Sequence, residues 1–381
     1  MKKEKLEKFK DIDELNKAVA VARKNNEMKR NSEWYGLQSI LGNTWALFYI
    51  LLGARESGKS YSVMEYFVNQ WKKKKIPFTW IRLNENSMKK MLANRAEKLV
   101  DADLRRKYDL DLYVRSNNVY DHGKKMCTVL ALSTFANDKG TALFDKDYIY
   151  KDLIINGVKQ YNEKGKVIRV WTGMEYHICL DEFQLEKTQK SQGDIAYQFV
   201  QQMENLVRSV KDHIKIFLIG NTLQEASDIL TMFEFIPMEF GRYKLKKKRA
   251  VIDYLEPTEA YKERRKGSVA DILMGNVSNF TNTIENDDTL IYNGKLIRPT
   301  NIFVFTKDLK FTMWDSKVIA PYNGEQCKQK IAMRPYLDLI FNQKLRDEII
   351  ESFDNRRFVY KNMLTFKKFQ KEIMLIKPRK S

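Results

Sequence analysis

The chain has 381 residues, of which 68 are Lys or Arg and 49 are Asp or Glu, so its net charge is +19. This length favours two domains, each large enough to bury a core, and a hydrophobic content of 43% excludes a disordered chain. A basic globular protein is expected to bind a polyanion, and charge alone leaves DNA, RNA and an anionic membrane surface open.

The cysteines and the apolar runs exclude further classes of protein. Cys127, Cys179 and Cys327 are far apart, which argues against a disulfide framework and a zinc knuckle and favours a reducing compartment. The basic N-terminal segment is interrupted by acidic residues, so we do not expect a signal peptide. The apolar run Trp45–Leu52 is well short of the roughly 20 residues that a membrane-spanning helix needs. We therefore expect no membrane segment.

Residues 1–30 predict a charged helix or arm, and from about residue 45 short β-rich runs alternate with helical stretches. This alternation is typical of an α/β domain with a mostly parallel sheet. We predict strands at Trp45–Leu52, Phe78–Arg82, Cys127–Leu132, His177–Leu180 and Lys215–Ile219, and helices at Ser60–Lys72 and Ile195–Lys211.

The alternation weakens after about residue 240, where the run GRYKLKKKRA (241–250) holds six basic residues. Residues 241–381 carry 29 basic and 17 acidic residues, so 29 − 17 = +12 of the total charge lies there. A charged helical stretch follows Pro257, and further on strand-like segments precede a basic helical tail, which predicts a small α+β domain. We expect an ATPase domain over 1–257, a linker over 258–290 and a C-terminal domain over 291–381.

The ATPase expectation depends on the run GARESGKS at residues 53–60, which matches the phosphate-binding pattern GxxxxGK[ST]. An apolar strand leads into it and a helix follows, so backbone N–H groups would surround a phosphate at a helix N-terminus. Lys59 would reach the β- and γ-phosphates, and the Ser60 hydroxyl would ligate Mg²⁺. We expect ATP and Mg²⁺ as cofactors, bound by Gly53, Ala54, Arg55, Glu56, Ser57, Gly58, Lys59, Ser60 and Tyr61.

A second motif supplies the acids that such a site needs. Asp181 and Glu182 follow the predicted strand His177–Leu180. Asp181 is expected to hold the magnesium ion, and Glu182 to act as the general base that orients a water. An adjacent Asp–Glu pair favours hydrolysis over transfer to a small acceptor.

Two polar residues lie near the predicted strand Lys215–Ile219. Asn221 follows it, where its amide would sense the γ-phosphate or place the water; alternatively it is a turn residue. Arg208 points away from the apolar face of the preceding helix, where it is either solvated or an arginine finger for a neighbouring subunit.

Two arginines complete the set of candidate phosphate contacts. Arg55 and Arg82 either contact the γ-phosphate or balance the charges of Glu56 and Asp181.

These motifs together resemble the DNA-packaging ATPases of protein-primed tailed bacteriophages of the phi-twenty-nine type, which are additional-strand (ASCE) P-loop ATPases related to FtsK and HerA. The segments that carry the resemblance are ILLGARESGKSY, FTWIRLN, ICLDEF and NLVRSVKDHIKIFLIGN, and the ERRK run at Glu263–Lys266 is similar to the family's linker. The family's finger arginine falls at Ser209 on ungapped spacing, which leaves the finger open among Arg208, Lys211 and a residue elsewhere.

The resemblance implies a ring-shaped motor, by analogy a pentamer, that drives double-stranded DNA into a procapsid. It implies a C-terminal domain of the RNase H-like fold without nuclease activity, which contacts the portal and, in some members, a packaging RNA. The protein would then act in the cytoplasm of the infected bacterial host, at the portal vertex.

Three alternatives remain open at this stage. A terminase with an active nuclease would need converging carboxylates, for which Asp308 and Asp315 on strand-like segments, with Asp338 and Asp347, are candidates. An ATP-dependent assembly or transfer protein, and a nucleic-acid-binding scaffold with structural ATP, are the others. The basic cluster from Phe366 to Lys380 is expected either to contact phosphates or to be a solvated tail.

Overall fold

The computed structural model describes residues 34–137, 149–184, 194–207, 212–221, 228–269, 272, 288–327, 329–335, 339 and 341–377. The chain divides into two compact units. The N-terminal unit comprises residues 1–223 and 239–284, and the C-terminal unit residues 224–238 and 285–381. Among the described helices, none combines the length and apolar character that would let it cross a membrane.

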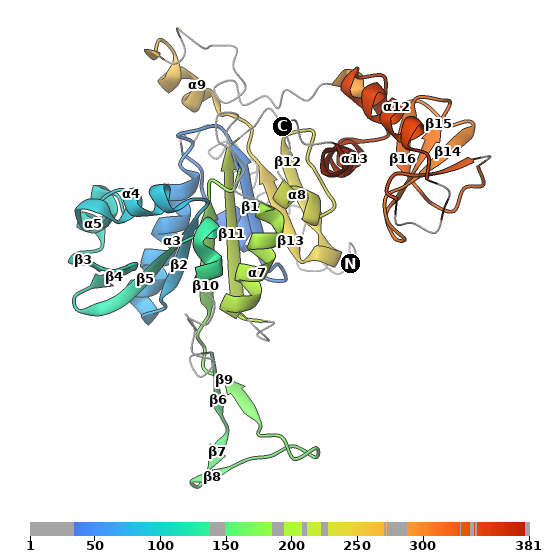
Figure 1. Cartoon of the computed structure of the whole chain (residues 1–381). Helices are drawn as coiled ribbons and strands as arrows, with labels where there is room; N and C mark the ends of the chain where they lie inside the picture. The colour runs from blue at the N-terminus through green and yellow to red at the C-terminus, as the bar shows by residue number, and fades with distance from the viewer. Residues whose placement is uncertain are drawn as a thin grey trace, which may run out of the picture. The chain divides into compact units, whose positions relative to one another are not determined.

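The N-terminal unit is built on one nine-stranded sheet with the order β12-β13-β1-β11-β10-β2-β5-β4-β3 (Figure 1). The six strands from β13 to β5 pair in parallel, whereas β12 at one edge and β4 and β3 at the other pair antiparallel. Strand β11 lies between β1 and β10 and pairs in parallel with both. The strands are β1 (Phe48–Gly53), β2 (Phe78–Arg82), β3 (Leu112–Arg115), β4 (Asn118–Asp121), β5 (Lys124–Ala131), β10 (Tyr176–Asp181), β11 (Ile214–Asn221), β12 (Gly241–Leu245) and β13 (Ala250–Tyr254).

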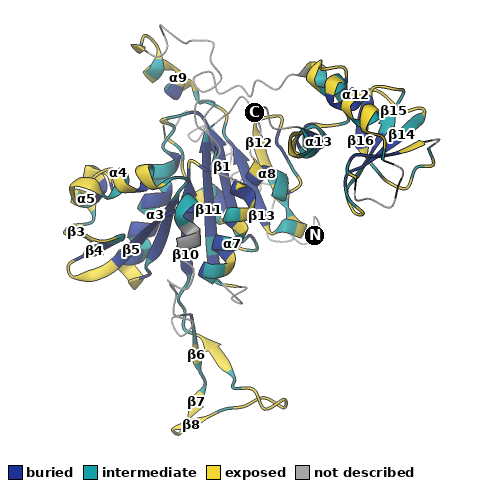
Figure 2. Cartoon of the chain, viewed as in Figure 1, coloured by how far each residue is buried: buried dark blue, intermediate teal, exposed yellow. Residues whose placement is uncertain are grey.

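Helices cover this sheet, and its central strands are buried (Figure 2). Helix α3 lies against β10 and β11 and turns the buried Val63, Phe67 and Trp71 toward the sheet. This spacing of four residues places all three on one face of a helix. The helices are α2 (Gln38–Leu41), α3 (Lys59–Lys74), α4 (Glu85–Ala96), α5 (Ala102–Lys107), α7 (Ile195–Val207) and α9 (Glu259–Arg265), with 3₁₀ turns at Leu132–Asn137 and Lys246–Lys248.

A thin antiparallel arm leaves the sheet ahead of β10, and its surface is largely exposed (Figures 1 and 2). It consists of β6 (Tyr150–Asp152), β7 (Ile154–Ile155), β8 (Val158–Lys159) and β9 (Arg169–Trp171). At its base, the Trp171 ring stacks on His213 at a centroid distance of 4.1 Å, and its Nε1 donates to the Met174 carbonyl at 2.7 Å. These contacts fix the arm where it joins the sheet.

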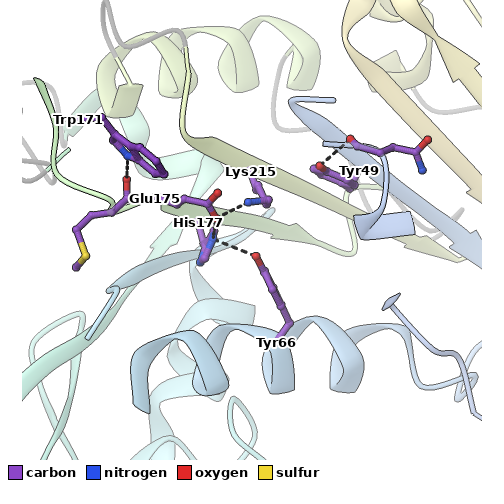
Figure 3. A network of polar contacts seen from close by, with 8 residues as sticks. Tyr49, Tyr66, Trp171, Glu175, His177 and Lys215 are labelled. Atoms are coloured by element: carbon purple, nitrogen blue, oxygen red, sulfur yellow. Dashed lines mark hydrogen bonds and ion pairs between the residues drawn. The ribbon is translucent and has the colours of Figure 1, made fainter. Parts of the chain in front are cut away.

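Polar side chains form a network at the start of β10 and β11, beside this base (Figure 3). The Glu175 carboxylate accepts a hydrogen bond from Lys215 and lies 3.3 Å from His177 Nε2, and Tyr66 OH lies 3.5 Å from the same nitrogen. Hydrogen bonding by His177 and Lys215 lowers the pKa of Glu175 to about 2, against the opposing effect of burial. Burial lowers the pKa of His177, so its ring is a neutral partner of Glu175.

The C-terminal unit is a five-stranded mixed sheet with the order β17-β14-β15-β16-β18. Its core surrounds Phe369, which is fully buried among the rings of Phe303, Phe305 and Phe311 at centroid distances of 5.3 to 6.0 Å. The elements are β14 (Pro299–Val304), β15 (Lys310–Trp314), β16 (Val318–Pro321), β17 (Gln329–Ala332), β18 (Val359–Tyr360), α12 (Gln343–Asp354), α13 (Met363–Ile376) and α8 (Asp228–Met232), which contacts α13, with a 3₁₀ turn at Asp288–Leu290.

The predicted fold class is confirmed: the N-terminal unit is α/β with a mostly parallel sheet, and the C-terminal unit is α+β. The RNase H-like assignment, the arm over 1–30 and the boundaries at 257 and 290 stay predictions. The basic run at 241–250, where the sequence alternation weakens, still joins the sheet: Gly241–Leu245 form edge strand β12, Lys246–Lys248 form a 3₁₀ turn, and Ala250 begins β13. Charged side chains on an edge strand remain in water while the strand pairs, so a basic run and a strand are compatible.

Candidate nucleotide and magnesium site

The parallel sheet brings the sequence motifs together where the carboxyl ends of its central strands meet. Strands β1, β11, β10 and β2 are neighbours, and all four end there. In register, Gly53 pairs with Asn221, Asp181 pairs with Ile219, and Leu180 pairs with Ile81, the residue before Arg82. Gly53 and Asn221, which are 221 − 53 = 168 positions apart in the chain, therefore end side by side, where open α/β sheets bind ligands.

The phosphate loop joins β1 to α3, and its conformation depends on Gly58, which caps α3 with φ +86°. Lys59 is 5% exposed, and its ammonium group donates to the carbonyls of Gly53 at 3.0 Å and Ala54 at 2.6 Å and to Ser57 Oγ at 3.1 Å. Burial lowers the pKa of Lys59 to about 8, although Asp181 and Glu182 act to raise it. The lysine is thus held inside the loop, where a phosphate would restore its preference for the charged form.

Asp181 ends β10 beside the first turn of α3. Ser60 Oγ donates to Asp181 Oδ1 at 3.1 Å, and Arg82 Nη1 donates to Asp181 Oδ2 at 2.8 Å. Burial raises the pKa of Asp181, which is 4% exposed, whereas Arg82 and the Ser60 hydrogen bond lower it. Hydroxyl and carboxylate oxygens at hydrogen-bond distance are a suitable donor pair for Mg²⁺, so these residues fit the ion.

Glu182 follows Asp181 with a positive φ of 52°, and its side chain is more than half exposed. Its carboxylate pairs with the second amino group of Arg82, so Arg82 bridges the two acids. Asn221 is the last residue of β11, not a residue just past the strand, and it lies beside Gly53. Lys59, Ser60, Asp181, Glu182 and Asn221 therefore converge, although their predicted roles stay predictions.

The sequence left open whether Arg55 and Arg82 contact the γ-phosphate or balance the charges of Glu56 and Asp181. Arg82 balances Asp181 and Glu182, as one of the alternatives proposed. Glu56 has φ +59° and pairs with Arg265 Nη1 at 2.7 Å, a partner that the sequence did not suggest. Arg208 and its neighbour Lys211 lie outside the described residues, so the arginine-finger hypothesis stays a prediction.

Sequence reasoning missed two segments that contact the outside of the phosphate loop. From α9, Tyr261 OH donates to the Arg55 carbonyl at 2.8 Å, and Arg264 Nη2 donates to the Glu56 carbonyl at 2.7 Å. Trp34 lies beside Gly58, 24 positions ahead of it in the chain. The ERRK run was a signal for part of α9, but it was interpreted only as a linker. Nothing in the sequence pattern marks Trp34.

The C-terminal acids do not lie on strands, contrary to expectation. Asp308 is in the turn before β15, and Asp315 is in the turn after it. The five residues of β15 separate them by roughly 16 Å, too far to share a metal ion. Asp347 pairs with Arg346 on α12, and Asp338 lies outside the described residues. Among the described residues, no three His, Cys, Asp or Glu side chains form a group that could hold a metal ion.

The side chains of the basic C-terminal cluster are less exposed than expected. Lys367 is only 8% exposed, because it lies on the buried face of α13. Its Nζ donates to Gln370 Oε1 at 3.3 Å. Lys377 pairs with Asp354. Residues 378–380 lie outside the described residues, so the phosphate-contact hypothesis for them stays a prediction.

Solved structures with a similar fold exist, whereas no protein-family model and no curated protein matches the chain. The Phi-28 gp11 DNA packaging motor aligns over 92% of this chain and 99% of its own, with a TM-score of 0.62 and 12% identity. The chain has the fold of a phage packaging-motor protein. The bacteriophage Phi-29 genome packaging motor assembly aligns over 91% of this chain and 99% of its own, with a TM-score of 0.58 and 16% identity. The resemblance that the motifs indicated is thus confirmed for the fold of nearly the whole chain.

Proposed function

We propose that the protein is an ATP-hydrolysing motor that moves double-stranded DNA into a viral procapsid. The observation that carries this proposal is the convergence of Lys59, Ser60, Asp181 and Glu182 at one edge of the sheet, on a fold that packaging-motor structures share. A structural role for ATP would need the phosphate loop but not an acid pair beside it. The acid pair therefore favours a motor over a scaffold.

Each residue has a role that follows from its position. The α3 N-terminus and Lys59 bind the β- and γ-phosphates, because backbone N–H groups, the helix dipole and the ammonium all favour negative charge there. Ser60 and Asp181 hold Mg²⁺, which when bound neutralises charge on the phosphate oxygens. Glu182 accepts a proton from the attacking water. Arg82 positions both acids, and Asn221 contacts the γ-phosphate or the water.

The partners follow from charge and from the likeness to motor assemblies. A net charge of +19 suits contacts with the DNA backbone that do not depend on sequence, as a motor moving along any sequence requires. We propose that copies of the chain form a ring, five by the family resemblance, at the portal vertex in the host cytoplasm. Arg208 is the proposed finger into the neighbouring site, and the C-terminal unit is the proposed contact for the portal or a packaging RNA.

The substitution Glu182→Gln tests the proposal that Glu182 is the general base. We expect the variant to bind ATP with the affinity of the unsubstituted protein, while DNA-stimulated hydrolysis falls at least a hundredfold, the usual worth of a general base. Glu163→Gln, at an exposed glutamate in the turn between Tyr161 and Val167, is the control and should hydrolyse ATP normally. An undiminished rate in Glu182→Gln would show that another group activates the water.

A further inference from the structure

Trp34 lies against the phosphate loop although about half of its surface is exposed. A β-carbon on Gly58 would lie 3.2 Å from Trp34 Cε3, so the indole is in contact with the last glycine of the loop. The exposed fraction of Trp34 is 51%. The exposed half of the indole is apolar surface that a bound group can cover, with a gain of hydrophobic free energy.

The segment that carries Trp34 is held firmly. Tyr35 N donates to the Ser57 carbonyl at 2.9 Å, and Ser62 Oγ donates to the Tyr35 carbonyl at 2.5 Å. The Tyr35 hydroxyl donates to Asp253 Oδ2 at 2.9 Å, and the same carboxylate accepts two hydrogen bonds from Arg242, at 2.7 and 2.9 Å. Trp34 is therefore fixed beside the loop before any ligand binds, so less conformational entropy is lost when a ligand binds.

An arginine supports the indole from α9. The guanidinium carbon of Arg264 lies 4.1 Å from the centre of the Trp34 ring, while its Nη2 bonds the Glu56 carbonyl. An aromatic ring stacked with an arginine is the combination that binds nucleobases without reading their hydrogen-bonding edges.

The position of Trp34 matches where a nucleoside would lie. Phosphates bound by the loop would lie at the N-terminus of α3, beside Gly58, so a nucleoside attached to them can reach the exposed surface of Trp34. We propose that Trp34, backed by Arg264, is the surface on which the base of the bound nucleotide stacks. This inference rests on the proposed function, because it needs a nucleotide in the loop.

Two probes separate base stacking from mere support of the loop. The full chain is titrated with ATP or with inorganic tripolyphosphate, which has no base, each with Mg²⁺. Trp34→Ala should weaken ATP binding about tenfold or more, the usual effect of losing one stacked base, and change tripolyphosphate binding by less than about twofold. Trp34→Phe should keep most of the ATP affinity, because it keeps an aromatic face.

Trp45→Ala is the matched control. Lys246 Nζ lies 3.7 Å from the centre of the Trp45 ring, so this tryptophan also has a cation over its face, but it precedes β1 at the end of the strand far from the loop. Its ATP affinity should equal that of the unsubstituted protein. Equal weakening of both probes in Trp34→Ala, or no weakening of either, would overturn the inference. Failure of the unsubstituted protein to bind ATP would instead refute the proposed function.

Discussion

Replacing Arg82 by Met tests whether this arginine holds the acid pair of the site. The Arg82 side chain is 12% exposed and that of Asp181 is 5% exposed, so the substitution leaves a buried carboxylate without its cation. Breaking a buried pair in this way costs about 3 to 5 kcal/mol of unfolding free energy. The pair with Glu182 adds less than about 1 kcal/mol, because that carboxylate is more than half exposed.

The loss of stability should depend on pH in a definite direction. Without Arg82, the pKa of Asp181 rises further above its value in the unfolded chain, which is about 3.9. A carboxyl with a raised pKa in the folded state costs nothing while it is protonated in both states, and the cost grows as the pH rises through the two pKa values. The destabilisation should therefore be larger at pH 7.5 than at pH 5.

Urea unfolding of the full chain at both pH values measures this effect. Arg106→Met is the control, because the Arg106–Asp103 pair is over 70% exposed on both sides and should contribute less than about 1 kcal/mol. Adding Asp181→Asn to Arg82→Met removes the unpaired buried charge and should restore part of the lost unfolding free energy. A stability of Arg82→Met within about 0.5 kcal/mol of the unsubstituted protein at pH 7.5 would refute the reasoning, as would an equal loss at both pH values.

Two further predictions concern titration. Because the pKa of Lys59 is about 8, ATP affinity should fall as the pH rises above 8, by about tenfold per unit, and a flat binding profile from pH 7 to 10 would contradict this. The pKa of Glu175 is about 2 against a usual 4.5, so its stabilising effect is complete above pH 4.5 and is lost as the pH falls toward 2. That shift corresponds to about 3 kcal/mol, so Glu175→Gln should show a smaller loss of unfolding free energy than the unsubstituted protein between pH 4.5 and 2; identical acid unfolding curves would oppose this.

The sequence predicted the parts of the site that depend on local pattern. The loop Gly53–Ser60 and the acids after His177–Leu180 were predictable, because a strand, a glycine-rich turn and a helix follow one another in the chain. The end of β11 was predictable within two residues, which placed Asn221 at the correct edge of the sheet.

The remaining contacts join residues that are distant in the chain, and no periodicity reports them. The segment of Trp34 is tied to the loop by Tyr35 N and Ser62, and to β13 by the Tyr35–Asp253 hydrogen bond, which joins residues 218 positions apart. The bridging role of Arg82 depends on the parallel register of β2 and β10. The sequence analysis placed Asp308 and Asp315 on strand-like segments, which was wrong, because single acids beside apolar runs do not mark where a strand begins or ends.

The central claim is that ATP hydrolysis at this site moves DNA. The most direct measurement is the amount of double-stranded DNA that becomes protected from nuclease inside cognate procapsids, followed together with ATP consumption. The unsubstituted protein should protect DNA only when ATP is present, and Glu182→Gln should bind ATP but protect none. Steady ATP hydrolysis without any protected DNA, or full protection by Glu182→Gln, would contradict the account.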